Sequence, residues 1–323
     1  MRSIYFLYVF LIYFCVGFFI LEARELSIKQ IEERKQADLE RLKEREKRGK
    51  KKFSKEITVS TKLIFLSMER KTPPVLSNLD PILDDEGFYG VKLAIEDNLT
   101  TGRFVGHDYK AEFHRILLSE DLKSEFQKLL DEGNKFFIVD LNEKELKTLF
   151  EVSNSEDIMI FNVRSKADSL RNENCKKNLL HIPPSYSMLS DALTQYLVKK
   201  KWNKWFLVTG PDENDRKYAE ALKKSAKKFN IKIKKEKVWD FSADLRRTAG
   251  KEVPIFTKGE KYDVLVVADE KGEFGEYLTY RTWDPRPIVG TQGLTPTSWH
   301  RTHEQWGATQ MQNRFRRESG RWM

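Results

Sequence analysis

The chain has 323 residues, of which 40% are hydrophobic and 33% are charged, and its formal net charge is +9. This length allows two domains with substantial cores, and the composition is typical of a folded protein with a heavily charged surface. Much of the excess positive charge lies between Arg24 and Lys55, so it belongs mainly to one segment. Zinc-finger spacing, an RNA-binding aromatic signature and a helix-turn-helix pattern are all missing, which argues against a nucleic-acid partner.

The first predicted element, residues 1–23, is a segment for export. One positive charge at Arg2 precedes an uninterrupted apolar run from Ile4 to Leu21. Such a run is too apolar for a surface helix and directs the chain to a membrane translocon. A cleaved signal peptide is the favoured interpretation, with Ala23 at the cleavage position, and a retained membrane anchor is the alternative.

Residues 24–55 are predicted to form a charged helical stalk or linker, because Glu and Lys/Arg recur there at helical spacings while apolar residues are too sparse for a stripe. From residue 57 onward the pattern alternates between strands and helices. Strands are predicted at 57–66, 109–118, 135–141, 157–162 and 177–182. Helices are predicted at 84–100, with Asp84, Asp85 and Glu86 at its N-terminus, at 119–133, with Ser119 as N-cap, and at 142–152.

The same alternation continues in the second half of the chain. Helices are predicted at 185–202 and 213–230, and strands at 204–210, 231–241, 262–269 and 286–293. Short, continuous apolar strands that alternate with helices predict parallel sheets covered on both faces. About ten strands exceed what one sheet comfortably holds, so we expect two α/β lobes, separated near Pro183-Pro184.

Ligands of open α/β sheets bind where loops leave the carboxyl ends of the strands. Five predicted loops meet this condition and offer polar groups. The candidate ligand-binding residues are Asp140, Asn142, Asn162, Arg164, Ser165, Asp215, Asp269 and Gln292. Arg164 can bind a carboxylate through two parallel hydrogen bonds, and Asp269 can accept one from an ammonium or hydroxyl group. The alternative for each residue is a turn or a helix cap.

Enzyme motifs are weak. No G-x-G-x-x-G follows the first strand, and neither G-K-[ST] nor G-x-S-x-G occurs, which argues against nucleotide binding and serine hydrolysis. His300, His303 and Glu304 suggest a metal-dependent hydrolase as a third hypothesis. Their "HRTHE" order is not the H-E-x-x-H of zinc proteases, so a helix start near Thr297 with surface histidines is favoured. Cys175 is expected to be a buried or partly buried inert thiol.

Three stretches of the sequence, residues 84–109, 184–229 and 290–323, resemble a known family. They are similar to extracytoplasmic substrate-binding proteins of ABC transporters, of the branched-chain amino acid receptor type. The strings "TTGRF" and W-H-R-x-x-E-Q-W-G-A most resemble the subgroup associated with PQQ-dependent alcohol catabolism. The resemblance covers about residues 57–323, in order.

This resemblance implies a type I periplasmic binding protein with two doubly wound, Rossmann-like lobes. Such a protein is a periplasmic solute-binding component of an ABC import system. It captures a small molecule by closing on a hinge and works with permease subunits at the inner membrane. It has no catalytic activity and no cofactor. The alternative is a membrane-anchored sensor or interaction protein that uses the same fold.

The resemblance also places the site and divides the chain. Residues 140–142 and 162–165 match first-lobe loops that hold an amino-acid head group, while Asp215, Asp269 and Gln292 fall near second-lobe and hinge loops. The residue types differ from those clamps, which argues against an amino-acid ligand. We expect lobes at 56–183 and 184–286 and a return segment at 287–323. Two departures from the family are the charged stalk and the end at Met323, where members continue with a further helix and several strands. The return segment is therefore expected to be incomplete.

Overall fold

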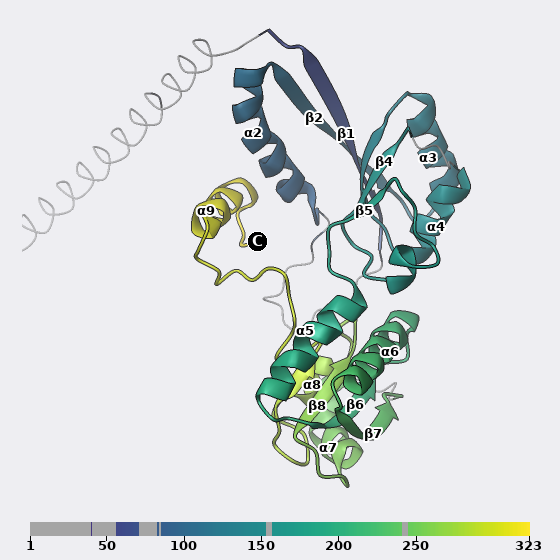
Figure 1. Cartoon of the computed structure of the whole chain (residues 1–323), viewed down its shortest axis with the longest axis vertical. Helices are drawn as coiled ribbons and strands as arrows, with labels where there is room; N and C mark the ends of the chain where they lie inside the picture. Colours follow the sequence, from purple (N-terminus) through teal and green to yellow (C-terminus); the bar gives the residue numbers. More distant parts are fainter. Residues whose placement is uncertain (1–39, 41–55, 71–82, 84, 153–156, 241–244) are drawn as a thin grey trace, which may run out of the picture. The chain divides into compact units, whose positions relative to one another are not determined.

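The computed structural model of the chain describes residues 40, 56–70, 83, 85–152, 157–240 and 245–323. The predicted export segment at 1–23 lies outside these residues, as does the predicted stalk at 24–55 apart from Glu40. Among the helices that are described, none combines the length and hydropathy needed to cross a bilayer. The described part of the chain builds two parallel β-sheets, and Figure 1 follows the order of their elements along the chain.

The first sheet has the strand order β2-β1-β3-β4-β5. Its strands are β1 (Val59–Met68), β2 (His107–Ile116), β3 (Phe136–Asp140), β4 (Met159–Asn162) and β5 (Leu179–His181). Between them run α2 (Phe88–Val105), α3 (Leu122–Asp131), α4 (Glu143–Val152) and the 3₁₀ helix η1 (Asp168–Arg171). β1, β3, β4 and β5 pair in parallel, as expected for strands joined by crossover helices.

Helices α3 and α4 cover one face of the first sheet. Their apolar residues, including Phe126 and Leu146, pack on Ile64, Val139 and Ile160 of the strands in one core. Near the opposite face of β1, Phe113 of β2 lies between Phe65 and Phe88 of α2, with ring centroids 5.7 and 4.3 Å away. Within a separate compact unit of residues 56–60 and 98–108, the Gly106 carbonyl accepts hydrogen bonds from the N–H groups of Thr58 and Val59.

The second sheet has the order β7-β6-β8-β9, and its described pairs are parallel. Its strands are β6 (Lys204–Thr209), β7 (Lys232–Val238), β8 (Val264–Ala268) and β9 (Ile288–Gly290), and its helices are α5 (Tyr186–Lys199), α6 (Glu213–Lys228), α7 (Leu245–Thr257) and α8 (Gly275–Leu278). Residues of α5 and α6 share one core with Trp205 and Val266, while residues of α7 and α8 share another with Phe206 and Val267. Because neighbouring strand residues point to opposite faces, these two cores cover both sides of the sheet.

The predicted α/β class with two parallel-sheet lobes is therefore confirmed. Pro183-Pro184 lies between β5 and α5 in the chain, and the domain boundaries drawn around it stay a prediction. The helix α7 was not predicted, and Gly250 and Pro254 inside it explain why its helical signal is weak.

Helix starts were predicted less well. The helix assigned to 84–100 begins at Phe88, because Gly87 has φ of +84° and cannot continue a right-handed helix. Asp85 and Glu86 therefore precede the helix, and Asp84 lies outside the described residues. The N-cap of α3 is Asp121, not Ser119: Asp121 directly precedes the first helical residue, and its side chain accepts the N–H of Ser124 at 3.0 Å.

The helix expected near Thr297 is α9 (Ala308–Ser319), which begins only after Gly307. Trp306 and Gly307 both have positive φ, so the chain reverses there before it becomes helical. Three ion pairs join residues 85–97, which include the first half of α2, to α9 and the residues after it. They are Asp85–Arg321, Lys92–Glu318 and Asp97–Arg314. The residue numbers rise along α2 while those of the partners fall along α9, so the two helices run antiparallel. We call these three ion pairs the ladder between α2 and α9.

Candidate functional site

A cavity of about 810 Å³ lies at the loops that leave the carboxyl ends of β1, β3, β4 and β8. Its volume falls in the range of pockets that bind small molecules. Four of the eight predicted ligand-binding residues line it: Asp140, Asn142, Arg164 and Ser165. The rule that ligands bind at strand carboxyl ends thus leads to a real cavity, although its lining is only partly the predicted one.

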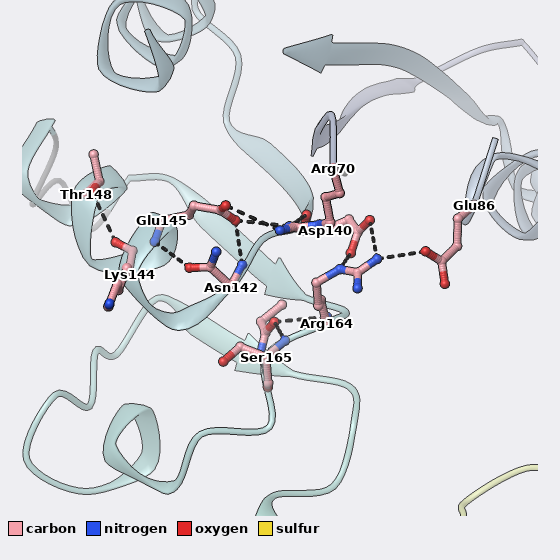
Figure 2. A network of polar contacts seen from close by, with 10 residues as sticks. Arg70, Glu86, Asp140, Asn142, Lys144, Glu145, Thr148, Arg164 and Ser165 are labelled. Carbon is pink, nitrogen blue, oxygen red and sulfur yellow. Dashed lines mark hydrogen bonds and ion pairs between the residues drawn. The ribbon is translucent and has the colours of Figure 1, made fainter. Parts of the chain in front are cut away.

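Arg164 is part of this lining and contacts both Asp140 and Glu86 (Figure 2). Its Nε and Nη2 donate to the two carboxylate oxygens of Asp140, with Nη2 to Oδ2 at 3.1 Å, in a fork-shaped ion pair. The same Nη2 also donates to Glu86 Oε2 at 2.8 Å. Burial lowers the pKa of Arg164, but the hydrogen bonds and charge of Asp140 and the charge of Glu86 outweigh this and raise it. The guanidinium therefore stays charged.

Asn142 has a structural task in addition to its place in the lining. Its Oδ1 accepts the N–H of Glu145 at 3.0 Å, and its own N–H donates to Glu145 Oε2 at 2.7 Å, which caps the N-terminus of α4 (Figure 2). Arg70, which was not predicted, donates to both oxygens of Glu145, at 3.3 and 3.0 Å, and to the Asp140 carbonyl at 2.9 Å. It links the ends of β1 and β3.

Asn162 is fully buried and does not line the cavity. Its Oδ1 accepts the N–H groups of Arg164 and Ser165, at 3.1 and 2.8 Å, and its Nδ2 donates to the Ser165 carbonyl at 2.7 Å. Asn162 thus stabilises a turn, which was the alternative to ligand binding that the sequence left open. Asn162 shapes the loop that presents Arg164 and Ser165.

Asp215 and Asp269 are buried behind the lining, with 1% and 2% exposure. Asp269 accepts the N–H groups of Glu273, Phe274 and Gly275 at 2.7–3.0 Å. Asp215 accepts those of Glu270 and Asp212 at 2.7 and 3.1 Å, and burial raises its pKa to about 6. Both carboxylates therefore hold the backbone around the loop after β8.

The loop that they hold presents Glu270 to the cavity. Glu270 accepts from Lys166 Nζ at 3.1 and 3.4 Å and from the Tyr186 hydroxyl at 3.3 Å. Burial, and then the charge of Glu270, raises the pKa of Tyr186. The residue predicted from the sequence in this loop was Asp269, the neighbour of Glu270. No sequence pattern pointed to Lys166 or Tyr186.

Glu143, also in the lining, is buried at the start of α4. Burial by itself would raise its pKa. Hydrogen bonds from Lys147, Lys217 and Ser169 lower the pKa to about 2 instead. Glu143 is therefore ionised and fully partnered over the whole physiological range.

The remaining sequence candidates lie outside the cavity lining. Gln292 follows β9 and packs near Gly275. His300 and His303 are exposed, with His300 Nδ1 2.7 Å from Thr302 Oγ1 and the His303 ring against Trp299. Over the described part of the chain, no group of three or more His, Cys, Asp or Glu side chains is arranged to hold a metal ion. Cys175, expected to be at least partly buried, is exposed because it lies in the turns after η1.

Comparison with known proteins gives a match over part of the chain. Residues 120–246 match a family model described as periplasmic binding protein. No match is found among curated proteins.

Solved structures share the fold over most of the chain. An ABC transporter substrate-binding protein from Desulfitobacterium hafniense in complex with Leu has a TM-score of 0.59 and 15% identity, over 81% of this chain and 78% of that one. A branched-chain amino acid ABC transporter ligand-binding protein from Burkholderia xenovorans has a TM-score of 0.61 and 13% identity, over 81% and 73%. A solute-binding protein from R. palustris in complex with benzoate has a TM-score of 0.57 and 13% identity, over 81% and 75%. The chain thus has the two-lobed fold of type I periplasmic binding proteins.

Proposed function

We propose that the protein is a solute-binding component of a periplasmic ABC import system. It captures a small molecule in the cavity at the strand ends and delivers it to permease subunits at the inner membrane, without catalysis and without a cofactor. The main support is the cavity itself, because its loops come from both sheets and its volume suits a small solute. The partial match to periplasmic binding proteins and the shared fold support the same function.

Several finer features belong to this proposal. Asp140, Asn142, Arg164 and Ser165 contribute to ligand binding, and to them we add Glu270 and Tyr186. The partial match to periplasmic binding proteins supports a periplasmic location, as does the apolar run at 4–21, to which we assign the role of signal peptide or anchor. The strings "TTGRF" and W-H-R-x-x-E-Q-W-G-A support membership of the subgroup associated with PQQ-dependent alcohol catabolism.

Structural similarity alone leaves the ligand open. The similar proteins were solved with leucine, which has an ammonium group, and with benzoate, which has none. At about 15% identity the shared fold does not transfer either ligand to this chain.

The function is tested by thermal unfolding of the purified full chain with a panel of alcohols, carboxylic acids, amino acids and cofactors. A ligand at a hundred times its dissociation constant adds about 2.7 kcal/mol to the free energy of unfolding. We expect a saturable rise in Tm of several degrees with one chemical class. An unchanged Tm with every class, together with flat calorimetric titrations, would refute the proposal.

A matched pair of variants assigns the binding to the cavity. Ser165→Ala removes a hydroxyl from the lining, whereas Ser124→Ala removes one from the exposed surface of α3. We expect the first variant to weaken the ligand-induced shift and the second to leave it unchanged. Equal behaviour of both variants would mean that the solute binds elsewhere.

A further inference from the structure

Most of the carboxylates around the cavity are already paired with cationic side chains. The six carboxylates in the lining are those of Glu69, Glu86, Asp140, Glu143, Glu145 and Glu270. Glu69 accepts a backbone N–H at 3.2 Å, and each of the other five contacts at least one Arg or Lys. At these five carboxylates a ligand ammonium must therefore displace a cationic partner, which is costly.

Glu270 is the carboxylate best placed to receive a ligand ammonium, but its place is taken. Its side chain is 15% exposed, and Lys166 Nζ lies 3.1 Å from Oε2 and 3.4 Å from Oε1. Tyr186 donates to the same Oε2. An ammonium on the ligand would have to replace that of Lys166, which is attached to the chain and so is present at a high effective concentration.

Arg164 offers the opposite situation, because one of its two partners is easily exchanged. Asp140 is held firmly, with a side chain only 13% exposed and two hydrogen bonds from the guanidinium. Glu86 is 67% exposed, and it reaches Arg164 from the residues before α2 (Figure 2). Exposed ion pairs contribute little stability, so a ligand anion competes with Glu86 at small cost.

We propose that the solute is a small carboxylate that lacks an ammonium group. Its carboxylate binds Arg164 in the place of the Glu86 side chain, so that the charge balance of the lining is preserved. Lys166 stays on Glu270 and excludes amino acids. This inference rests on the proposed function, and it names Glu86 and Lys166 as the residues that determine specificity.

The test uses amino acids paired with their deaminated acids: leucine with 4-methylpentanoate, phenylalanine with 3-phenylpropanoate, alanine with propanoate, and glutamate with glutarate. Isothermal titration of the full chain measures both members of each pair. We expect at least one acid to bind, and its amino acid to bind at least tenfold more weakly. An amino acid that binds as tightly as its acid overturns the inference.

Lys166→Met tests the exclusion of ammonium. We expect the ratio of the dissociation constants of the amino acid and the acid to fall at least tenfold, because Glu270 becomes available to the ammonium. Lys144→Met is the matched control: Lys144 pairs with Glu213 at 2.7 Å, and neither residue lines the cavity. We expect it to leave the ratio unchanged, and an unchanged ratio in Lys166→Met as well overturns the role of Lys166.

Two further variants test the carboxylate subsite. Glu86→Gln removes the competing anion and should tighten the binding of the acid a few-fold. Arg164→Lys keeps the charge but loses the forked geometry, and should weaken it about ten- to a hundredfold. Tighter binding in Arg164→Lys, or weaker binding in Glu86→Gln, overturns the proposed exchange.

The failure of this inference is distinguishable from that of the proposed function. Binding of uncharged solutes alone, in the wider Tm panel, overturns the carboxylate and leaves the solute-binding function standing. If nothing binds in either assay, both proposals fail.

Discussion

The loops at the ends of the first and second sheets use similar residues for different purposes. In the first sheet, Asp140 and Arg164 face the cavity, while Asn142 and Asn162 accept backbone N–H groups. In the second sheet, Asp215 and Asp269 are both buried and accept backbone N–H groups, while the neighbouring Glu270 faces the cavity. A carboxylate at the end of a parallel strand thus either faces the cavity or builds the loop that does.

What separates the two cases is the number of backbone donors nearby. A tight loop that leads into a helix exposes several N–H groups without partners, and a buried carboxylate satisfies them. The loop after β8 has three such donors, which all point at Asp269. Asp140 instead meets a guanidinium, because Arg164 follows the next strand along the sheet.

The largest difference in stability is expected when one side chain that holds a loop is removed from each sheet. Asp269→Ala leaves three N–H groups, two of them buried, without an acceptor, so we expect the free energy of unfolding to fall by about 3–5 kcal/mol. Asn142→Ala removes a helix cap and should cost about 1 kcal/mol. Chemical denaturation measures both.

Similar losses in these two variants would mean that the second-sheet loop does not depend on its aspartate. Far-ultraviolet circular dichroism of each variant in the absence of denaturant checks that the starting state is folded. If Asp269→Ala fails to fold, Asp269→Asn, which keeps one acceptor oxygen, should give an intermediate loss.

The pH dependence of the free energy of unfolding should have opposite signs for Asp215, beside the second sheet, and Glu143, beside the first. Burial raises the pKa of Asp215 from 3.8 to about 6, so the folded chain binds this proton more tightly than the unfolded chain does. The free energy of unfolding should therefore fall, by about 2 kcal/mol, as pH rises from about 4 to 6. For Glu143, whose pKa is lowered from 4.5 to about 2, stability is present above pH 4.5 and is lost as pH falls towards 2.

Denaturant titrations between pH 2 and 7 measure both windows. Asp215→Asn should flatten the change between pH 4 and 6, whatever its effect on overall stability, and Glu143→Gln should flatten the change below pH 4.5. A wild-type chain whose stability rises from pH 4 to 6, with the same slope in Asp215→Asn, would show that Asp215 does not titrate in this way.

The smallest effect is expected at Gln292. It was predicted to contact the ligand, yet it does not line the cavity. We expect Gln292→Ala to change ligand affinity less than twofold and the free energy of unfolding by less than about 0.5 kcal/mol. Calorimetric titration with the solute found for the wild type measures the affinity, and a tenfold loss would restore Gln292 to the site.

Much of the fold could be predicted because its signal is local. Continuous apolar runs such as 264–268 identify buried parallel strands, and their order along the chain locates the loops at which ligands of such sheets bind. Within those loops the sequence does not tell which side chain turns outward. That depends on partners brought from elsewhere, as Arg70 is to Glu145 over 75 positions and Tyr186 to Glu270 over 84. The sequence likewise does not reveal that the side chain of Asn162 accepts the backbone N–H groups of Arg164 and Ser165.

The ladder between α2 and α9 affects the order in which parts of the chain can fold during synthesis. Asp85 and Arg321 are separated by 236 residues, so their pair cannot form until nearly the whole described chain has been synthesised. At about 5–20 residues per second, α2 waits roughly 10–50 s for its partner on the ribosome. Throughout that interval Tyr89, which ends 6.5 Å from the Phe315 ring, lacks this packing contact. These two elements therefore cannot pack together until Arg321 has been synthesised.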